Sequence, residues 1–339
     1  MIKNLSKKEI EDINIARKRN EKIKKIHDKN LFMNLDDLRF ATNEIVAKYR
    51  ASRLKCKVLI EIGSGVGFQT FAFAKVCKKV YAVEIDERKI KYAEENAKIL
   101  KLKNIEFVND DALKIDLKKA DAVFCETARS PESSERSLAE LEPNIFKFLE
   151  KYGKLTDKIC IDVPSQLKKI DLDCEKEYLS VNNELNRLNL FFGSLKKVNK
   201  SAVALPGNHR LEETNEKAKN SKALKYLYDI DGAVLKAGLI NELAIQTKSF
   251  IFTESLLTSL RLVKSPFFKS SFLILNKCKE FDEVIEYLKG IDYGKIILRQ
   301  KIDPDKYWNE RKKYENKLKG NKTCYLFVFK NNFLIAQKL

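Results

Sequence analysis

Histidine, methionine and tryptophan are rare in this chain of 339 residues, which contains two, two and one of them respectively. The two histidines, His27 and His209, lie far apart, and no two of the seven cysteines have C-x-x-C spacing. Protein zinc sites usually gather their Cys and His ligands at such short spacings. We therefore expect no metal in this protein.

Long apolar runs are also missing from the sequence. No uninterrupted stretch approaches the roughly 20 residues that a membrane span requires, and the opening MIKNLSKKEI lacks the apolar core of a signal peptide. The odd number of cysteines, several of them inside apolar runs, indicates reduced thiols. We expect a cytoplasmic protein that does not associate with a membrane.

The composition that remains is that of a folded protein with excess positive charge. A hydrophobic content of 44% is enough for one large or two modest domains and excludes disorder as the main state. The net charge is +18, of which residues 261–339 carry +9 and residues 161–260 only +1. Such an excess favours polyanionic partners, nucleic acid or an anionic membrane surface. With only 13 arginines, a general lysine bias is an alternative, but a bias would spread the charge more evenly.

Strand-like and helix-like segments alternate from residue 57 onward. We expect strands at 58–62, 80–85, 105–110, 121–126, 158–163, 176–181 and 201–206, with helices at 68–77, 87–100 and 183–195. This rhythm predicts the α/β class, with a Rossmann-like, mainly parallel sheet of about seven strands covered by helices.

The same pattern predicts the domain organisation. Residues 1–40 are charged, with isoleucines at helical spacing, and are expected to form an exposed helical segment. The sheet domain should cover residues 41–206, because Pro206-Gly207 and a polar run follow it. We expect a linker with a helical passage over 207–260 and a second, smaller α/β domain over 261–339.

A glycine-rich turn follows the first predicted strand. The sequence EIGSGVG contains Glu61, Gly63, Gly65 and Gly67 and leads into a helix. Glycines there let the backbone turn sharply and approach a ligand closely, beside the free N–H groups of the helix start. The alternative is a dinucleotide fingerprint, G-x-G-x-x-G, but its third glycine would fall at Phe68.

Acidic residues follow the next two strands. Glu84 ends the second strand, where a carboxylate can accept hydrogen bonds from both ribose hydroxyls, whereas Asp86 is expected only to open the next helix. Asp111, followed by Ala112, comes after the third strand and could accept from an adenine amino group. The alternative is that Asp111 forms a turn.

Together these residues resemble the class I S-adenosylmethionine-dependent methyltransferases, whose motif has the form acid-x-Gly-x-Gly-x-Gly. The resemblance implies a seven-stranded methyltransferase sheet with S-adenosylmethionine as cofactor. The glycine turn would then lie beside the methionine part of the cofactor, Glu84 would bind the ribose, and Asp111 with Ala112 would bind the adenine. The substrate should meet the methyl group outside the carboxyl end of the fourth strand.

A narrower resemblance, carried by segments such as 38–54, 174–206 and 227–244, is to methyltransferases that end in a THUMP-like domain. That family usually ends its fourth strand Asp-Pro-Ala-Arg, where this chain has Glu126, Thr127, Ala128 and Arg129. Arg136 would stand in for a later arginine. The resemblance also implies that Thr42 and Asn43 lie near the cofactor. The alternative for Thr42 is a helix N-cap.

Glu126 and Arg129 are the predicted catalytic residues. Glu126 would orient or deprotonate the group that accepts the methyl, and Arg129 would hold a phosphate or support Glu126. The neighbouring Cys125 could be imagined as a nucleophile. We expect instead a buried strand cysteine, because adjacent strand residues face opposite sides of a sheet.

The segment 299–322 combines bases with aromatic residues, a mixture that suits RNA because bases contact phosphates and aromatic rings stack on unpaired nucleobases. THUMP domains are associated with binding structured RNA. The alternative is a solvated helix with an aromatic core face. The candidate RNA-binding residues are Arg299, Lys306, Trp308, Arg311, Lys312 and Lys313.

From the sequence we therefore predict an S-adenosylmethionine-dependent methyltransferase that modifies a nucleobase, a guanine nitrogen being favoured, in tRNA or rRNA. Two alternatives stay open. The chain could methylate a protein or a small molecule, or it could be a non-catalytic RNA-binding protein with a vestigial cofactor pocket.

Overall fold

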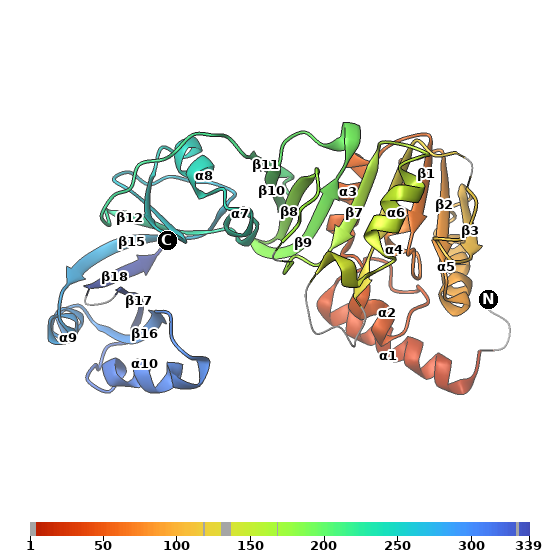
Figure 1. The fold of residues 1–339 in the computed structure, drawn as a ribbon. Helices are drawn as coiled ribbons and strands as arrows, with labels where there is room; N and C mark the ends of the chain where they lie inside the picture. Colours follow the sequence, from red (N-terminus) through yellow and green to blue (C-terminus); the bar gives the residue numbers. More distant parts are fainter. Residues whose placement is uncertain (1–4, 118, 130–136, 168, 330–331) are drawn as a thin grey trace. The chain divides into compact units, whose positions relative to one another are not determined.

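A computed structural model describes residues 5–117, 119–129, 137–167, 169–329 and 332–339. The chain forms two compact units, Met1–Glu213 and Thr214–Leu339 (Figure 1). Within the described residues, no helix is both long and apolar enough to cross a membrane. Those residues also contain no group of three or more His, Cys, Asp or Glu side chains that could hold a metal ion.

The first unit is built on a nine-stranded sheet in the order β11-β10-β8-β9-β7-β4-β1-β2-β3. Five neighbouring strands are parallel: β1 (Val58–Ile62), β2 (Lys79–Glu84), β3 (Ile105–Asn109), β4 (Ala122–Glu126) and β7 (Ile159–Val163). The other four are β8 (Glu175–Val181), β9 (Glu184–Phe191), β10 (Lys200–Leu205) and β11 (His209–Glu212). Of these, β8 and β10 pair parallel with each other, whereas β9 and β11 are antiparallel to their neighbours. The predicted α/β class is confirmed, with two strands more than expected.

The additional strand β9 replaces the helix predicted at 183–195. It pairs antiparallel with β8 through a two-residue turn, Asn182-Asn183, in which both residues have positive φ. Asparagine tolerates that backbone better than most residues, and such turns match the twist of a hairpin. The asparagine pair at the turn was the available signal for a hairpin.

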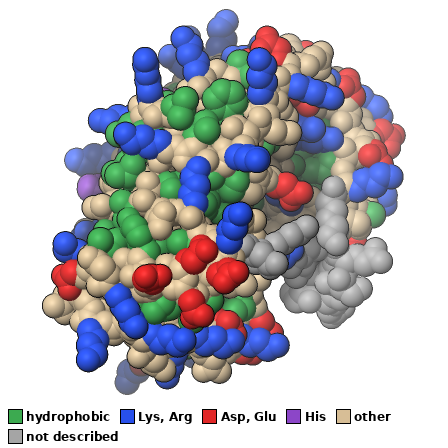
Figure 2. All heavy atoms as spheres, turned by 90° about the vertical axis from the view of Figure 1, so that its left-hand side faces the viewer, with side chains coloured by type: hydrophobic (Ala, Val, Ile, Leu, Met, Phe, Trp, Pro, Cys, Tyr) green, Lys and Arg blue, Asp and Glu red, His purple; other side chains and the backbone are tan. Residues whose placement is uncertain are grey.

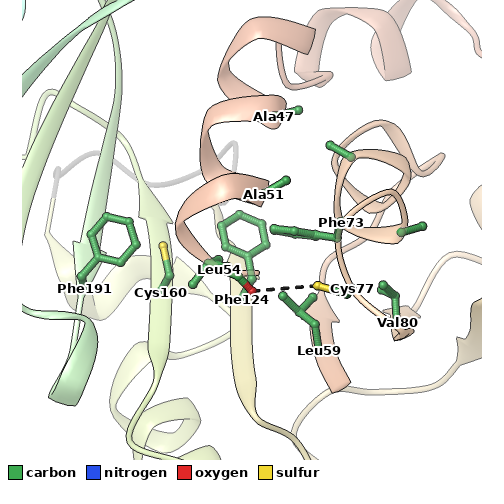
Figure 3. Close-up of a cluster of buried hydrophobic side chains, with 12 residues drawn as sticks. Ala47, Ala51, Leu54, Leu59, Phe73, Cys77, Val80, Phe124, Cys160 and Phe191 are labelled. Carbon is green, nitrogen blue, oxygen red and sulfur yellow. Dashed lines mark hydrogen bonds between the residues drawn. The ribbon is translucent and has the colours of Figure 1, made fainter. Parts of the chain in front are cut away.

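Helices α3 (Glu44–Arg53) and α4 (Phe68–Ala74) cover one face of the sheet, and α5 (Glu87–Ile99) and α6 (Ile145–Tyr152) complete the helical layers. Figure 3 shows the core below α3 and α4, where Ala47 and Ala51 lie above the aromatic rings. The rings of Phe73 and Phe124 meet edge to face with centroids 5.3 Å apart. The face of β4 that carries Phe124 therefore points toward α3.

The N-terminal segment forms α1 (Lys7–Ile23) and α2 (Leu35–Phe40). Its buried side chains, Ile13, Ala16, Leu31 and Met33 among them, pack with Val66 and with Tyr92 of α5. The Arg88 guanidinium donates two hydrogen bonds, of 2.8 and 2.9 Å, to the Asp37 carboxylate. These contacts fix the segment to the residues that follow β1 and β2.

The second unit is a seven-stranded sheet in the order β13-β14-β12-β15-β18-β17-β16. Its strands are β12 (Tyr226–Ile230), β13 (Phe250–Thr253), β14 (Leu256–Ser259), β15 (Phe268–Cys278), β16 (Tyr293–Arg299), β17 (Lys322–Phe329) and β18 (Asn332–Lys338). Its helices are α7 (Gly232–Ala237), α8 (Ile240–Gln246), α9 (Phe281–Lys289) and α10 (Tyr307–Glu315). A second, smaller sheet domain is therefore present, as the sequence predicted.

Its boundary differs from the expected one. Pro206-Gly207 lies in the connection between β10 and β11, which pair antiparallel, so the chain leaves the first unit only after Glu213. The expected linker over 207–260 is instead part of the two sheets, because Leu227 of β12 and Leu257 of β14 are fully buried. A proline-glycine turn inside a hairpin resembles one between domains when only local sequence is considered.

Candidate active site

The order of the parallel strands in the first unit changes direction between the neighbours β1 and β4. From β1 the chain proceeds to β2 and β3 on one side, and β4 and β7 lie on the other. In open α/β sheets, ligands bind outside the carboxyl ends of the strands at such a switch point. The residues that follow β1, β2 and β4 therefore define the candidate site.

The glycine turn after β1 uses backbone conformations that other residues rarely adopt. Gly63, Gly65 and Gly67 have φ of +76°, +56° and +96°. The Gly63 and Ser64 N–H groups both donate to the Val83 carbonyl, at 2.9 and 3.1 Å. A Cβ on Gly63 would lie 2.7 Å from the Glu126 carbonyl oxygen, whereas a Cβ on Gly65 would meet nothing within 4 Å. The turn therefore packs directly on the end of β4 and leaves open space at Gly65.

We expect Gly63→Ala to lower the free energy of unfolding by about 1–3 kcal/mol, because it adds a backbone clash to an unfavourable φ. Gly65→Ala is the matched control, since it carries the positive φ without the clash and should cost about 1 kcal/mol. Urea unfolding of both variants measures the difference. Equal losses would mean that the contact with β4 does not constrain the turn.

Glu61 precedes the turn and is fully buried within β1. The Thr70 hydroxyl and the Arg50 guanidinium partly stabilise its charge, yet neither Glu61 oxygen makes a hydrogen bond of normal geometry with the described residues. Burial raises the pKa of Glu61 well above its usual range, and the charges of Glu126 and Glu84 add to the effect. An unsatisfied buried carboxylate is costly, so this position is suited to a cationic or hydrogen-bond-donating ligand.

Glu84 links the end of β2 to the turn. Its Oε2 accepts a hydrogen bond from the Gly65 N–H at 2.9 Å, and its Oε1 accepts one from the Asp86 N–H at 3.0 Å. Each carboxylate oxygen has further lone pairs for a ligand hydroxyl. Asp86 caps α5 by accepting from the N–H groups of Arg88 and Lys89, as expected of the residue that opens that helix.

Asp111 and Ala112 lie just beyond β3, which ends at Asn109. The Leu113 N–H donates to the Asp111 carboxylate at 2.9 Å and holds the pKa of this group below its usual range. This is the turn-forming geometry that was the alternative for Asp111. The Ala112 carbonyl accepts a 2.7 Å hydrogen bond from the Tyr152 hydroxyl, so the loop is tied to α6.

Glu126 ends β4, and its side chain is 22% exposed. The Thr42 hydroxyl lies 3.1 and 3.3 Å from its two carboxylate oxygens, and Arg187 Nη2 lies 3.6 Å from Oε1. Burial raises the pKa of Glu126, and the Arg187 charge offsets part of this rise. The expected alternative for Thr42 is wrong, because Asn43 is the residue that caps α3. Thr42 is a partner of Glu126.

Behind Glu126, polar residues form one row across neighbouring strands. Glu126 pairs in register with Asp162 of β7, Asp162 with Asn189 of β9, and Asn189 with Glu177 of β8. Arg50 of α3 is fully buried and reaches two of them, with a 2.8 Å ion pair to Asp162 and a 2.9 Å hydrogen bond to the Asn189 side chain. The row places the Asp162 carboxylate beside Glu126, and the buried Arg50 balances the charge of Asp162.

Arg50, Asp162 and Arg187 were not predicted as site residues. Arg187 Nη1 lies 3.3 Å from Asp162, so it bridges that carboxylate and Glu126. Asp162 is the only charged residue in the otherwise apolar strand sequence ICIDV, and this isolated acid was the available sign of a functional role. Arg187 could not be recognised while its segment was expected to be a helix.

The residues near Glu126 in the sequence include Cys125 and Arg129. Cys125 is buried, pairs in register with Ile62 and Ile161, and has a thiol whose pKa burial raises well above its usual range, which confirms the structural role. The backbone of Arg129 belongs to β5 (Ala128–Arg129), which pairs with β6 (Leu141–Glu142), but its side chain lies outside the described structure. Arg136 also lies outside the described residues.

The predicted RNA-binding residues lie on β16, α10 and the turn before that helix. Lys306, Trp308, Lys312 and Lys313 are exposed, with Trp308 at 62%. Three of the bases have acidic partners, Arg299 with Asp229, Arg311 with Glu315 and Lys313 with Glu310. Tyr314 belongs to the core of the unit. Figure 2 likewise shows Lys and Arg side chains over the face in view, with acidic groups among them.

Three comparisons relate this chain to known proteins. Residues 54–229, just over half of the chain, match a family described as a methyltransferase domain. The ribosomal RNA small subunit methyltransferase A of Wigglesworthia glossinidia brevipalpis is 32% identical over 99 residues, 29% of this chain and 36% of that protein. A protein of Methanococcus maripaludis named probable ribosomal RNA small subunit methyltransferase A is 42% identical over 69 residues, 20% of this chain and 26% of that protein. The chain thus spans 26% to 36% of the length of these relatives.

The fold likeness extends further than the sequence likeness. A crystal structure of a candidate methyltransferase from Porphyromonas gingivalis superposes with a TM-score of 0.75 at 16% identity. The superposition covers 97% of this chain and 88% of the Porphyromonas gingivalis chain. At this identity the likeness shows a shared fold that includes both sheets.

Proposed function

Because this chain belongs to the methyltransferase domain family, we propose that it transfers the methyl group of S-adenosylmethionine to a nucleobase in tRNA or rRNA, a guanine nitrogen being favoured. The observation that carries the proposal is the meeting of three features at the β1 and β4 ends. These are the open glycine turn, the unsatisfied carboxylate of Glu61 and the partly exposed carboxylate of Glu126.

The residues at the strand ends fit the cofactor. The open space at Gly65 leaves room for a ligand against the backbone, and the buried Glu61 offers an unpartnered carboxyl group whose ionised form a cationic methionine part would stabilise. Glu84 would accept from the ribose hydroxyls, and Asp111 with Ala112 would contact the adenine. Thr42, the partner of Glu126, would lie beside the reacting groups. When bound, the cofactor supplies an activated methyl group on a sulfonium, which already carries its leaving group.

Glu126 is the proposed catalytic residue, and Arg129 would hold a substrate phosphate or support it. A carboxylate beside the acceptor nitrogen can accept its hydrogen bond, direct its lone pair and take up its proton. The raised pKa of Glu126 brings this group closer to neutral pH, where a general base is most effective. Thr42 and Arg187 contact both of its oxygens between them and keep it from rotating.

The RNA substrate is supported by the names of the two ribosomal RNA methyltransferases that match part of the chain. It is supported too by the exposed Lys306, Trp308 and Lys312, which with Arg299, Arg311 and Lys313 would contact RNA if the second unit is THUMP-like. A protein or a small molecule is the competing substrate class.

Nucleoside analysis of RNA tests the proposal. A strain without the gene should lack one methylated nucleoside in digested tRNA or rRNA, as measured by mass spectrometry. The wild-type gene should restore it, Glu126→Gln should not, and the surface variant Glu106→Gln should. Identical nucleosides with and without the gene would contradict the RNA assignment, and a methyl group missing from a protein instead would favour the alternative.

Cofactor binding is tested separately by titration calorimetry with S-adenosylmethionine. Gly65→Ala should weaken binding at least about tenfold, because its Cβ enters space that the cofactor would use. A wild-type protein that binds no cofactor would favour the vestigial pocket, and unchanged binding by Gly65→Ala would contradict the proposed position of the ligand.

A further inference from the structure

Phe40 is an exposed aromatic residue held close to Glu126 by its backbone. Its side chain is 65% exposed although it ends the short helix α2. The Phe40 carbonyl lies 3.5 Å from Arg187 Nη2, and the same Nη2 lies 3.6 Å from the Glu126 carboxylate. Two residues later, Thr42 contacts that carboxylate directly.

The backbone that presents Phe40 is fixed on both sides. The Lys25 ammonium donates to the carbonyls of Leu38 and Arg39, each at 2.9 Å, and Ala41 and Thr42 are buried. The exposed ring is thus attached to a fixed backbone, so less order has to be gained when a ligand binds.

The surroundings of the ring suit a planar, electron-rich partner. The Arg39 guanidinium lies 5.2 Å from the ring centroid of Phe40. Aromatic rings and guanidinium planes are the groups on which proteins stack unpaired RNA bases. An aliphatic protein side chain would gain less from such a pair.

A groove of about 560 Å³ adjoins the same segment. Its lining includes Lys24, Lys25, Lys29 and Lys48, together with the acids Glu21 and Glu44 and with Asn43, the residue that follows Thr42. Lys29 and Lys48 pair with Glu21 and Glu44, and Lys25 holds the Leu38 and Arg39 carbonyls. The groove is therefore of mixed charge, and its lysines are suited to phosphates only where an RNA strand displaces these partners.

We propose that Phe40, with Arg39 beside it, stacks on the unpaired RNA base that is presented to Glu126. This inference rests on the proposed function and deepens it, because it assigns recognition of the target base to the N-terminal segment. A base must leave its helical stack before an enzyme can act on it, and a fixed aromatic ring stabilises the unstacked state.

Three substitutions at one position test the stacking. Methyl transfer to total RNA from the deletion strain is measured at varied RNA concentration. Phe40→Ala should lower kcat/KM by about 5- to 150-fold, the range measured for loss of one base-stacking contact. Phe40→Trp should stay within about threefold of wild type, whereas Phe40→Leu should resemble Phe40→Ala, because leucine is apolar but not planar. Phe146→Ala, which removes an exposed phenylalanine from α6, should change nothing.

Binding of a short single-stranded oligoribonucleotide that contains 2-aminopurine gives a second readout. Stacking on Phe40 should change its fluorescence in wild type but not in Phe40→Ala, while both proteins bind S-adenosylmethionine equally. If wild type methylates RNA and Phe40→Ala or Phe40→Leu does so at the wild-type kcat/KM, the stacking proposal is wrong and the proposed function survives. If wild type neither methylates nor binds RNA, both are wrong.

Discussion

Glu126→Gln should lower the rate of methyl transfer by about 10²- to 10⁴-fold, the usual contribution of a positioned general base. The amide keeps the size of the side chain and can still accept from the Thr42 hydroxyl, but it cannot take up a proton. It also loses the charge that faces Arg187. The fold and the cofactor site should therefore remain while the chemical step fails.

Single-turnover transfer of labelled methyl groups measures this effect, with S-adenosylmethionine affinity determined in parallel. Glu106→Gln, on the exposed face of β3, makes the same chemical change away from the site and should retain full activity. A fall in cofactor affinity that accounts for the whole loss of rate would assign Glu126 to cofactor binding instead of catalysis.

Glu61→Gln should have opposite effects on stability and on cofactor binding. Burial raises the folded-state pKa of Glu61 above its unfolded value of 4.5. At a pH between these two pKa values, Glu61 is protonated in the folded state but ionised in the unfolded state. The free energy of unfolding therefore falls as the pH rises from 4.5 to the folded-state pKa. A neutral amide removes this penalty. At pH 8 the cofactor-free variant should therefore melt about 3–10 °C above wild type, and the difference should shrink as pH falls toward 4.5.

The same variant should bind S-adenosylmethionine about 10- to 100-fold more weakly, since it loses a charge-assisted hydrogen bond. Thermal unfolding with and without the cofactor measures both effects in one series. The control is again Glu106→Gln, which makes the same chemical change at an exposed position. A variant that melts below wild type at every pH, with unchanged cofactor affinity, would contradict this account of Glu61.

The site residues that could be predicted are those whose position depends only on the few residues next to them in the sequence. Gly63, Gly65 and Gly67 adopt the positive φ expected of the turn, and Glu84 and Glu126 end the strands expected of them. A strand end and a glycine turn are visible in a few consecutive residues, and the parallel sheet then brings such ends together.

What sequence reasoning missed depends on contacts between distant residues. The contact between Thr42 and Glu126, 84 positions away, was not predicted. Arg187 reaches the site only because β9 inserts between β7 and β8, whereas a helix was expected for that segment. Local propensity is a weak prior where strand pairing decides the outcome.

The buried row behind Glu126 also constrains the order in which the site can be completed during synthesis. Arg50 is made early, but Asp162 and Asn189, which hold it in the finished protein, follow more than a hundred residues later. Until β7 and β9 have been synthesised and paired, docking α3 would bury a charged guanidinium without its full set of partners, which is strongly unfavourable. The end of β4 that carries Glu126 therefore gains its neighbours only when the strands that follow it in the chain have joined the sheet.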